Sequence, residues 1–184
     1  FGVNFNVYYL ALRKKFKEIL RSTELWTYLG IILVSIVLVS ISISTEYDTL
    51  EEIIRQSAFQ VTSIITTTGF ATTDFDLWPS FSKTILLCLM VIGACAGSTG
   101  GGLKVARVLL LFKSLKRNIA QMLHPRKVQV IRNNGSVVSE RIVANTNAYL
   151  CAYVVLMFGS FVLISLDGYS VGINFSAVLS CLNN

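Results

Sequence analysis

Long uncharged stretches dominate the pattern of hydrophobic and polar positions along this chain. No charged residue occurs from Leu25 to Thr45, and a helix of that length rises about 30 Å, enough to cross the hydrocarbon core of a bilayer. A second uncharged stretch covers residues 146–166. A third apolar region, 84–118, is interrupted by a group of glycines. The pattern predicts membrane spans at 25–45, 84–118 and 146–166, the second of them broken.

Two shorter apolar segments each follow one of the uncharged spans. Residues 53–65 and 173–182 are too short to cross a bilayer, so we expect two re-entrant pore helices. The order of span, pore helix and span then occurs twice. This predicts an all-α polytopic membrane protein built from repeated helix–pore-helix–helix units, as in potassium channels. The alternating sequence on both sides of Asn133-Asn134-Gly135, within a linker at 122–145, predicts a small cytoplasmic β-hairpin.

Composition and charge both favour the membrane interpretation. Hydrophobic residues make up 53% of the 184 positions and charged residues 14%, and the mean hydropathy is +0.64. Lys and Arg gather in residues 1–24 and 104–141, whereas 46–83 is mostly acidic. The positive-inside rule then places the two basic segments in the cytoplasm and the acidic segment outside. The net charge of +6 is therefore explained by membrane topology, and we expect no nucleic acid partner.

The loop after the first pore helix carries the residues with the clearest chemistry. A dehydrated monovalent cation needs several oxygen ligands at once, and backbone carbonyls of an extended loop supply them without a net charge. Gly69 allows backbone conformations that turn these carbonyls toward one axis. The alternative is a simple polar turn between two helices. The predicted ion filter consists of Thr66, Thr67, Thr68, Gly69 and Phe70.

The glycines that interrupt the second span predict an unwound segment. Each glycine costs a helix about 1 kcal/mol relative to alanine, and non-helical backbone at membrane depth survives only beside protein or a watery cavity. We therefore expect an unwound loop beside the pore, with a small-residue helix-packing surface as the alternative. Lys104 is expected to extend toward the cytoplasmic face. The predicted loop residues are Gly93, Gly97, Ser98, Thr99, Gly100, Gly101, Gly102 and Lys104.

These two motifs together resemble the Trk/Ktr/HKT superfamily of potassium transporters, and most of all its bacterial TrkH/TrkG branch. The resemblance implies four non-identical repeats around one pore. It divides this fragment into the end of the second repeat with a linker (1–24), the third repeat (25–121), the hairpin linker (122–145) and the start of the fourth repeat (146–184). It also implies that backbone oxygens of Thr67, Thr68 and Asn184 bind potassium. By the same resemblance, the glycine loop lies under the filter and acts as a gating loop.

The resemblance further implies potassium uptake across a bacterial inner membrane by a multi-pass, non-enzymatic protein. The expected partners are membrane lipid, a second copy of the protein in a homodimer, and a cytosolic TrkA-like nucleotide-binding subunit. No covalently bound cofactor is expected, and K⁺ is the transported ion. The alternative function is a sodium- or proton-coupled solute carrier with broken helices. The four cysteines lack a CxxC pair, and we interpret them as small buried residues.

Overall fold

Helix α3 (Thr23–Ser42) forms the first predicted span in a computed structural model that describes residues 2–124, 130–133 and 136–183. The helix begins slightly before the predicted boundary because the Ser22 side chain accepts a hydrogen bond from the backbone N–H of Leu25. The outward face is apolar at every fourth residue, with Leu33 64% and Ile41 67% exposed. Such a stripe suits contact with lipid chains.

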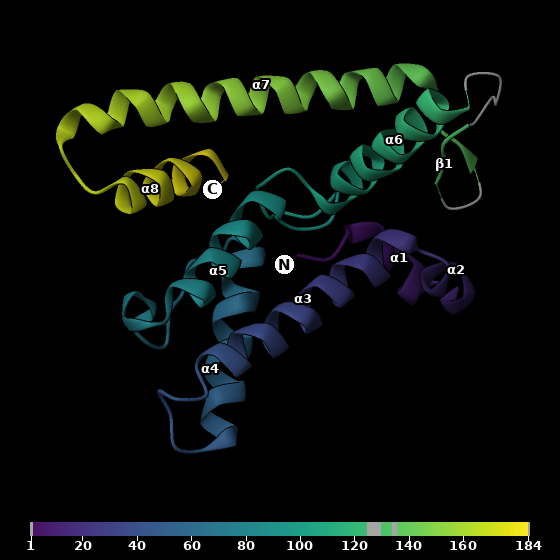
Figure 1. Cartoon of the computed structure of the whole chain (residues 1–184). Coiled ribbons are helices and arrows are strands. Elements are labelled where there is room, and N and C mark those ends of the chain that lie inside the picture. Colours follow the sequence, from purple (N-terminus) through teal and green to yellow (C-terminus); the bar gives the residue numbers. More distant parts are fainter. Residues whose placement is uncertain (1, 125–129, 134–135, 184) are drawn as a thin grey trace.

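The predicted broken span is two helices, α5 (Ser80–Ile92) and α6 (Val105–Leu123), and it extends further at both ends than the predicted 84–118. None of the residues from 93 to 104 is helical. The predicted first pore helix corresponds to α4 (Leu50–Ile65), which starts before residue 53 because the Thr49 hydroxyl caps its first turn. Helix α4 packs against both α3 and α5. The non-helical segment lies near the centre of the molecule (Figure 1).

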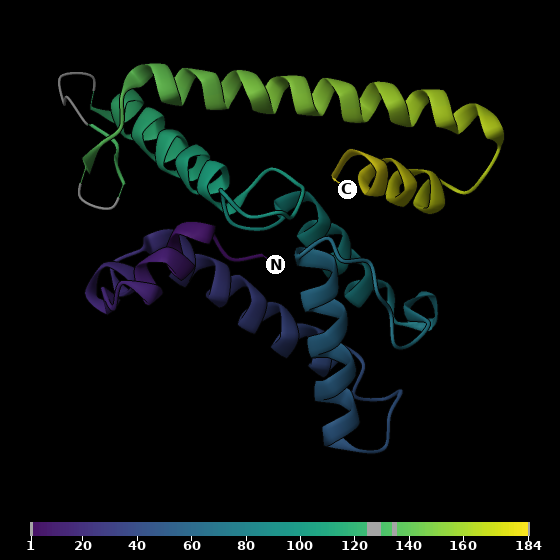
Figure 2. The same ribbon diagram turned by 180° about the vertical axis from the view of Figure 1, so that it is seen from behind.

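The C-terminal part consists of a long helix and a short one that lie side by side (Figures 1 and 2). Helix α7 (Glu140–Ile164) begins before the predicted span at 146–166, so residues 140–145 of the predicted linker are helical. The predicted second pore helix corresponds to α8 (Val171–Asn183), close to the predicted 173–182. The remaining helical elements are α1 (Phe5–Leu12), α2 (Phe16–Leu20) and the short 3₁₀ turns η1 (Phe75–Leu77) and η2 (Ser165–Asp167).

A two-stranded hairpin lies between α6 and α7 in the sequence. Strand β1 (Arg132–Asn133) pairs antiparallel with β2 (Ser136–Val137), with Arg132 opposite Val137. The pairing is shorter than the alternating pattern suggested. Residues 125–129 and 134–135 lie outside the described part of the chain, and so does the predicted turn at Asn134-Gly135. The placement of the hairpin in the cytoplasm stays a prediction.

The interior of the molecule mixes apolar packing with hydroxyl contacts. Val39, Ile43 and Ile65 are fully buried where α3, α4 and α5 meet. In the same region the Ser40 and Ser57 hydroxyls are 2.7 Å apart and hydrogen-bonded. Small polar residues inside and large apolar residues outside are typical of helices packed in a membrane. The prediction of buried cysteines holds only for Cys95, since Cys88, Cys151 and Cys181 are exposed in this chain.

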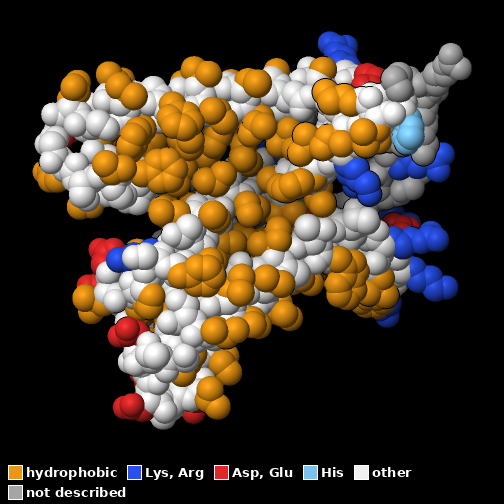
Figure 3. Space-filling view, viewed as in Figure 1, with side chains coloured by type: hydrophobic (Ala, Val, Ile, Leu, Met, Phe, Trp, Pro, Cys, Tyr) orange, Lys and Arg blue, Asp and Glu red, His pale blue; other side chains and the backbone are white. Residues whose placement is uncertain are grey.

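Most of the Lys and Arg residues and most of the Asp and Glu residues lie at opposite ends of the molecule (Figure 3). Lys and Arg gather at the end formed by α1, α2 and the hairpin, and the acidic residues of the segment 46–76 lie at the other end (Figure 3). Apolar surface covers the region between them. Two helices of the described chain, Thr23–Ser42 and Glu140–Asp167, are long and apolar enough to cross a membrane. The charge separation along the sequence is therefore also a separation in space.

Candidate functional site

The predicted filter begins at a strained helix end. Helix α4 closes with the two hydrogen bonds of a Schellman motif, from Thr67 N–H to Ile64 O and from Thr68 N–H to Ser63 O, each 3.0 Å. This motif needs a left-handed residue, and Thr67 occupies that position with a φ of 55°. Glycine normally fills it, because a β-branched side chain is strained there. Other contacts must therefore hold Thr67 in place.

Hydroxyl groups fold the rest of the predicted filter back onto α4. Ser63 Oγ donates to the carbonyl of Phe70 at 2.5 Å, and Thr68 Oγ1 donates to the carbonyl of Ser63 at 3.1 Å. Thr66 Oγ1 donates to Thr62 O at 2.6 Å. Gly69 has a φ of +74° and is exposed. Ser63 was not among the predicted residues, although the row of hydroxyl residues preceding the loop was a visible signal.

The glycine-rich segment folds into a closed loop between α5 and α6. Its two arms meet through hydrogen bonds from Leu103 N–H to Val91 O (3.1 Å) and from Val105 N–H to Ala94 O (3.0 Å). At Gly93, where φ is +67°, a Cβ atom would lie 2.3 Å from the carbonyl oxygen of Gly101. A side chain is therefore excluded at Gly93 by the other arm of the loop.

The loop and the predicted filter touch each other directly. The backbone N–H of Gly101 donates to Thr67 Oγ1 at 3.1 Å. A Cβ on Gly100 would lie 3.3 Å from the carbonyl oxygen of Thr66, and a Cβ on Gly101 would lie 1.5 Å from the carbonyl oxygen of Asn183. The loop therefore packs against the C-terminal ends of both short helices, α4 and α8.

The other side of the loop rests on the N-terminal segment. Cys95 N–H donates to Gly2 O at 3.0 Å, and Phe5 N–H donates to Gly97 O at 3.1 Å. The Glu24 carboxylate accepts a hydrogen bond from Ala96 N–H. The segment that leads into α1 runs close to the centre of the molecule (Figure 1). Sequence reasoning missed these contacts, although Glu24, an acid directly before an uncharged span, was a signal.

Lys104 does not extend toward the end of the molecule, so that prediction is wrong. Its Nζ donates to the carbonyl oxygens of Gly100 and, at 3.4 Å, Ser98. An unwound segment leaves carbonyls without helical partners, and a nearby ammonium group satisfies them. Lys104 therefore helps to close the loop on itself. Ser98 also donates its hydroxyl to Cys95 O at 2.6 Å, while Thr99 is exposed.

A cavity of about 90 Å³ lies where the ends of α4 and α8 approach α5. At its edge the Asn183 side chain accepts a hydrogen bond from the Tyr153 hydroxyl at 3.0 Å. Asn184, the predicted ligand of the second filter, lies outside the described residues. The described chain brings no three His, Cys, Asp or Glu side chains together as a metal site. The cavity is lined by Ser63, Ile64, Thr67, Gly69, Met90, Ser180 and Asn183.

The family follows from comparison with known proteins. Residues 15–184 match the model of the TrkH family, described as a cation transport protein. The chain belongs to the TrkH family. The predicted relationship to the TrkH/TrkG branch is thereby confirmed, and so is the expectation of a largely helical membrane protein of a transport family.

Individual relatives agree with this assignment. The Trk system potassium uptake protein TrkH of Salmonella typhimurium is 34% identical over the whole of this chain, and TrkG of Escherichia coli is 32% identical over 98% of it. The crystal structure of the potassium transporter TrkH from Vibrio parahaemolyticus superposes with a TM-score of 0.89 over 97% of this chain, at 31% identity. The chain spans 38% of the length of these two curated relatives and 39% of the solved chain.

Proposed function

We propose that this chain is part of a larger potassium uptake protein, in which residues 66–70 form one section of a selectivity filter and the loop from Gly93 to Lys104 is the gate beneath it. The observation that carries the proposal is the hydrogen bond from Gly101 N–H to Thr67 Oγ1. It joins the strained end of a pore helix to an unwound segment of a membrane helix. The names of the relatives support potassium as the transported ion.

The chemistry of the two segments suits these roles. Carbonyl oxygens of Thr67 and Thr68 would replace part of the hydration shell of potassium, and Asn184 would contribute from the next repeat. The C-terminal end of α4 directs its partial negative charge toward the same region. Four such sections are needed to surround one ion, so the pore forms only with the remaining repeats of the whole protein. The division at residues 24, 121 and 145 into successive repeats belongs to this proposal.

The surroundings of the whole protein are also part of the proposal. The basic end of the molecule in Figure 3 would face the bacterial cytoplasm, with the hairpin beside a TrkA-like nucleotide-binding subunit. The acidic end would face outward, and two copies of the protein would form a dimer in the inner membrane. The separation of charge across an apolar band supports this orientation.

The replacement Gly69→Ser in the full-length protein tests the filter assignment. Open space surrounds Gly69, so a serine meets no steric obstacle, but its φ of +74° costs a residue with a side chain about 1–2 kcal/mol. We expect the loop to relax and the preference for rubidium over sodium to fall in uptake by cells that lack other potassium transporters. Gly30→Ser, also in open space but within α3, is the matched control. A Gly69→Ser protein with normal expression and unchanged ion preference would falsify the filter assignment.

A further inference from the structure

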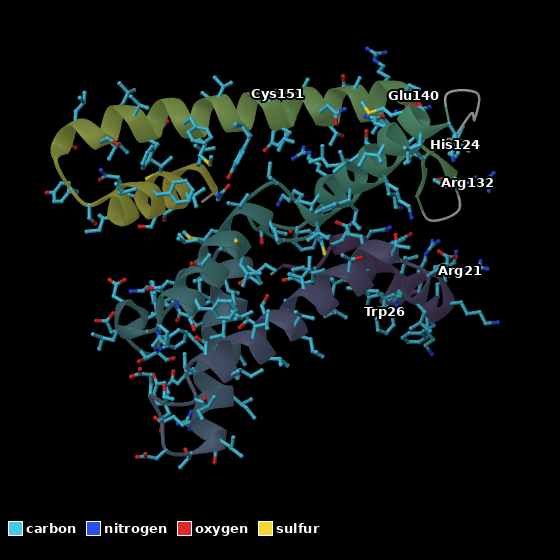
Figure 4. The ribbon with its side chains drawn as sticks, viewed as in Figure 1. Arg21, Trp26, His124, Arg132, Glu140 and Cys151 are labelled. Carbon is cyan, nitrogen blue, oxygen red and sulfur yellow. The ribbon has the colours of Figure 1, made fainter. Side chains whose placement is uncertain are left out.

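A basic pocket lies far from the filter, at the end of the molecule where Lys and Arg gather (Figure 3). Its volume is about 230 Å³, and it lies between one face of α6 and the segment leading into β1. No acidic side chain of the described chain lines it. Arg132 and the end of α6 at His124 mark its place in Figure 4. The lining residues are Lys113, Lys116, Arg117, Ala120, Val130, Ile131 and Arg132.

The pocket wall is held in place by two polar contacts. Lys113 Nζ donates to the carbonyl of Arg132 at 2.9 Å, which ties the start of the hairpin to α6. Arg117 Nη1 pairs with Glu140 Oε1 at 2.5 Å, which ties α6 to the first turn of α7. These contacts fix α6, β1 and α7 relative to one another around the pocket. The pocket is therefore more than a loose group of surface lysines.

Arg117 retains an unused donor at this site. Its side chain is only 13% exposed, and within the described residues its buried Nε has no hydrogen-bond partner. Buried polar groups are nearly always paired, so an unpaired guanidinium N–H indicates a missing acceptor. Guanidinium groups match the oxygens of phosphate in geometry and charge. Lys116 lies beside Arg117, and Glu140 is the acid that pairs with Arg117 among the described residues. The lining of the pocket is therefore rich in cations and suited to an oxyanion.

The adjoining face of α6 indicates what carries the oxyanion. Phe112, Leu115, Ile119 and Met122 follow one another at helical spacing and are 67%, 56%, 50% and 82% exposed. A helix with exposed apolar residues on one face and cations on the next is typical of the membrane interface. We propose that this pocket binds the phosphate headgroup of an acidic phospholipid, whose acyl chains lie along the apolar face of α6. This inference does not depend on which ion the protein carries.

Native mass spectrometry of the full-length protein, titrated separately with phosphatidylglycerol and with phosphatidylcholine, tests the site. We expect Arg117→Gln and Lys116→Gln each to weaken phosphatidylglycerol binding about fivefold, because one cation near an anionic headgroup changes the dissociation constant by about that factor. Glu140→Gln removes the competing acid and should strengthen binding. Arg21→Gln, with the same loss of charge at the same end but outside the pocket, should bind like the unmodified protein (Figure 4).

Four results would overturn the proposal. One is equal weakening by Arg21→Gln, which would show general surface attraction. Another is unchanged binding in Lys116→Gln, whose exposed side chain can be replaced without harm to the fold even if Arg117→Gln fails to fold. Displacement of the lipid by millimolar inorganic phosphate would identify free phosphate as the ligand. Finally, pocket variants that still bind phosphatidylglycerol but no longer bind a cytosolic partner protein would show that the pocket is a protein-binding site.

Discussion

Replacing Thr67 by valine removes the acceptor of the Gly101 N–H while leaving a β-branched side chain of nearly the same shape in the strained position. The hydrogen bond contributes about 1 kcal/mol net, and leaving the partly buried Gly101 N–H without a partner costs up to about 2 kcal/mol. If the bond holds the loop in its closed position, its loss shifts the equilibrium toward the open position by a factor of about 5 to about 30. Basal rubidium flux through the full-length protein should rise within that range.

The assay is rubidium uptake into vesicles that contain equal amounts of each purified variant, with no regulatory partner added. Thr67→Ser retains the hydroxyl and should remain near the basal flux. Thr66→Val is the neighbouring control, because the Thr66 hydroxyl bonds to Thr62 O, Ser63 O and the Thr68 hydroxyl and not to the loop. The reasoning is refuted if Thr67→Val conducts at the basal rate, or if Thr66→Val raises the flux equally.

Two further predictions concern the glycine loop and the packing of the spans. Gly101→Ala would place a methyl group 1.5 Å from the carbonyl oxygen of Asn183, so the loop or α8 must move. We expect rubidium flux to change in the same uptake assay while expression is retained. Unchanged flux would contradict the contact between the loop and α8. Ile43→Ala removes a fully buried side chain and should cost about 2–5 kcal/mol, lowering the thermal unfolding midpoint in detergent. Ile41→Ala, at a position 67% exposed, should lower it much less, and equal effects would show that the packing is misassigned.

The order of elements was predictable from the sequence because the membrane imposes a length on its helices. The uncharged segment at 25–45 and the shorter apolar segment at 53–65 each correspond to one helix in the structure, with boundaries displaced by a few residues. Helix ends depend on caps such as Ser22 and Thr49, which hydropathy does not register. The break near Gly93 was also predictable, since five closely spaced glycines destabilise any helix.

Contacts between distant segments were decided only by the tertiary structure. Thr67 and Gly101 are far apart in the sequence, and their hydrogen bond exists because α4 and α5 pack so that the end of one meets the loop after the other. The same packing directs Lys104 onto the loop carbonyls instead of toward solvent. The sequence shows which residues suit a membrane, a turn or an ion. Helix packing determines which of these residues come into contact, and its geometry depends on many side chains at once.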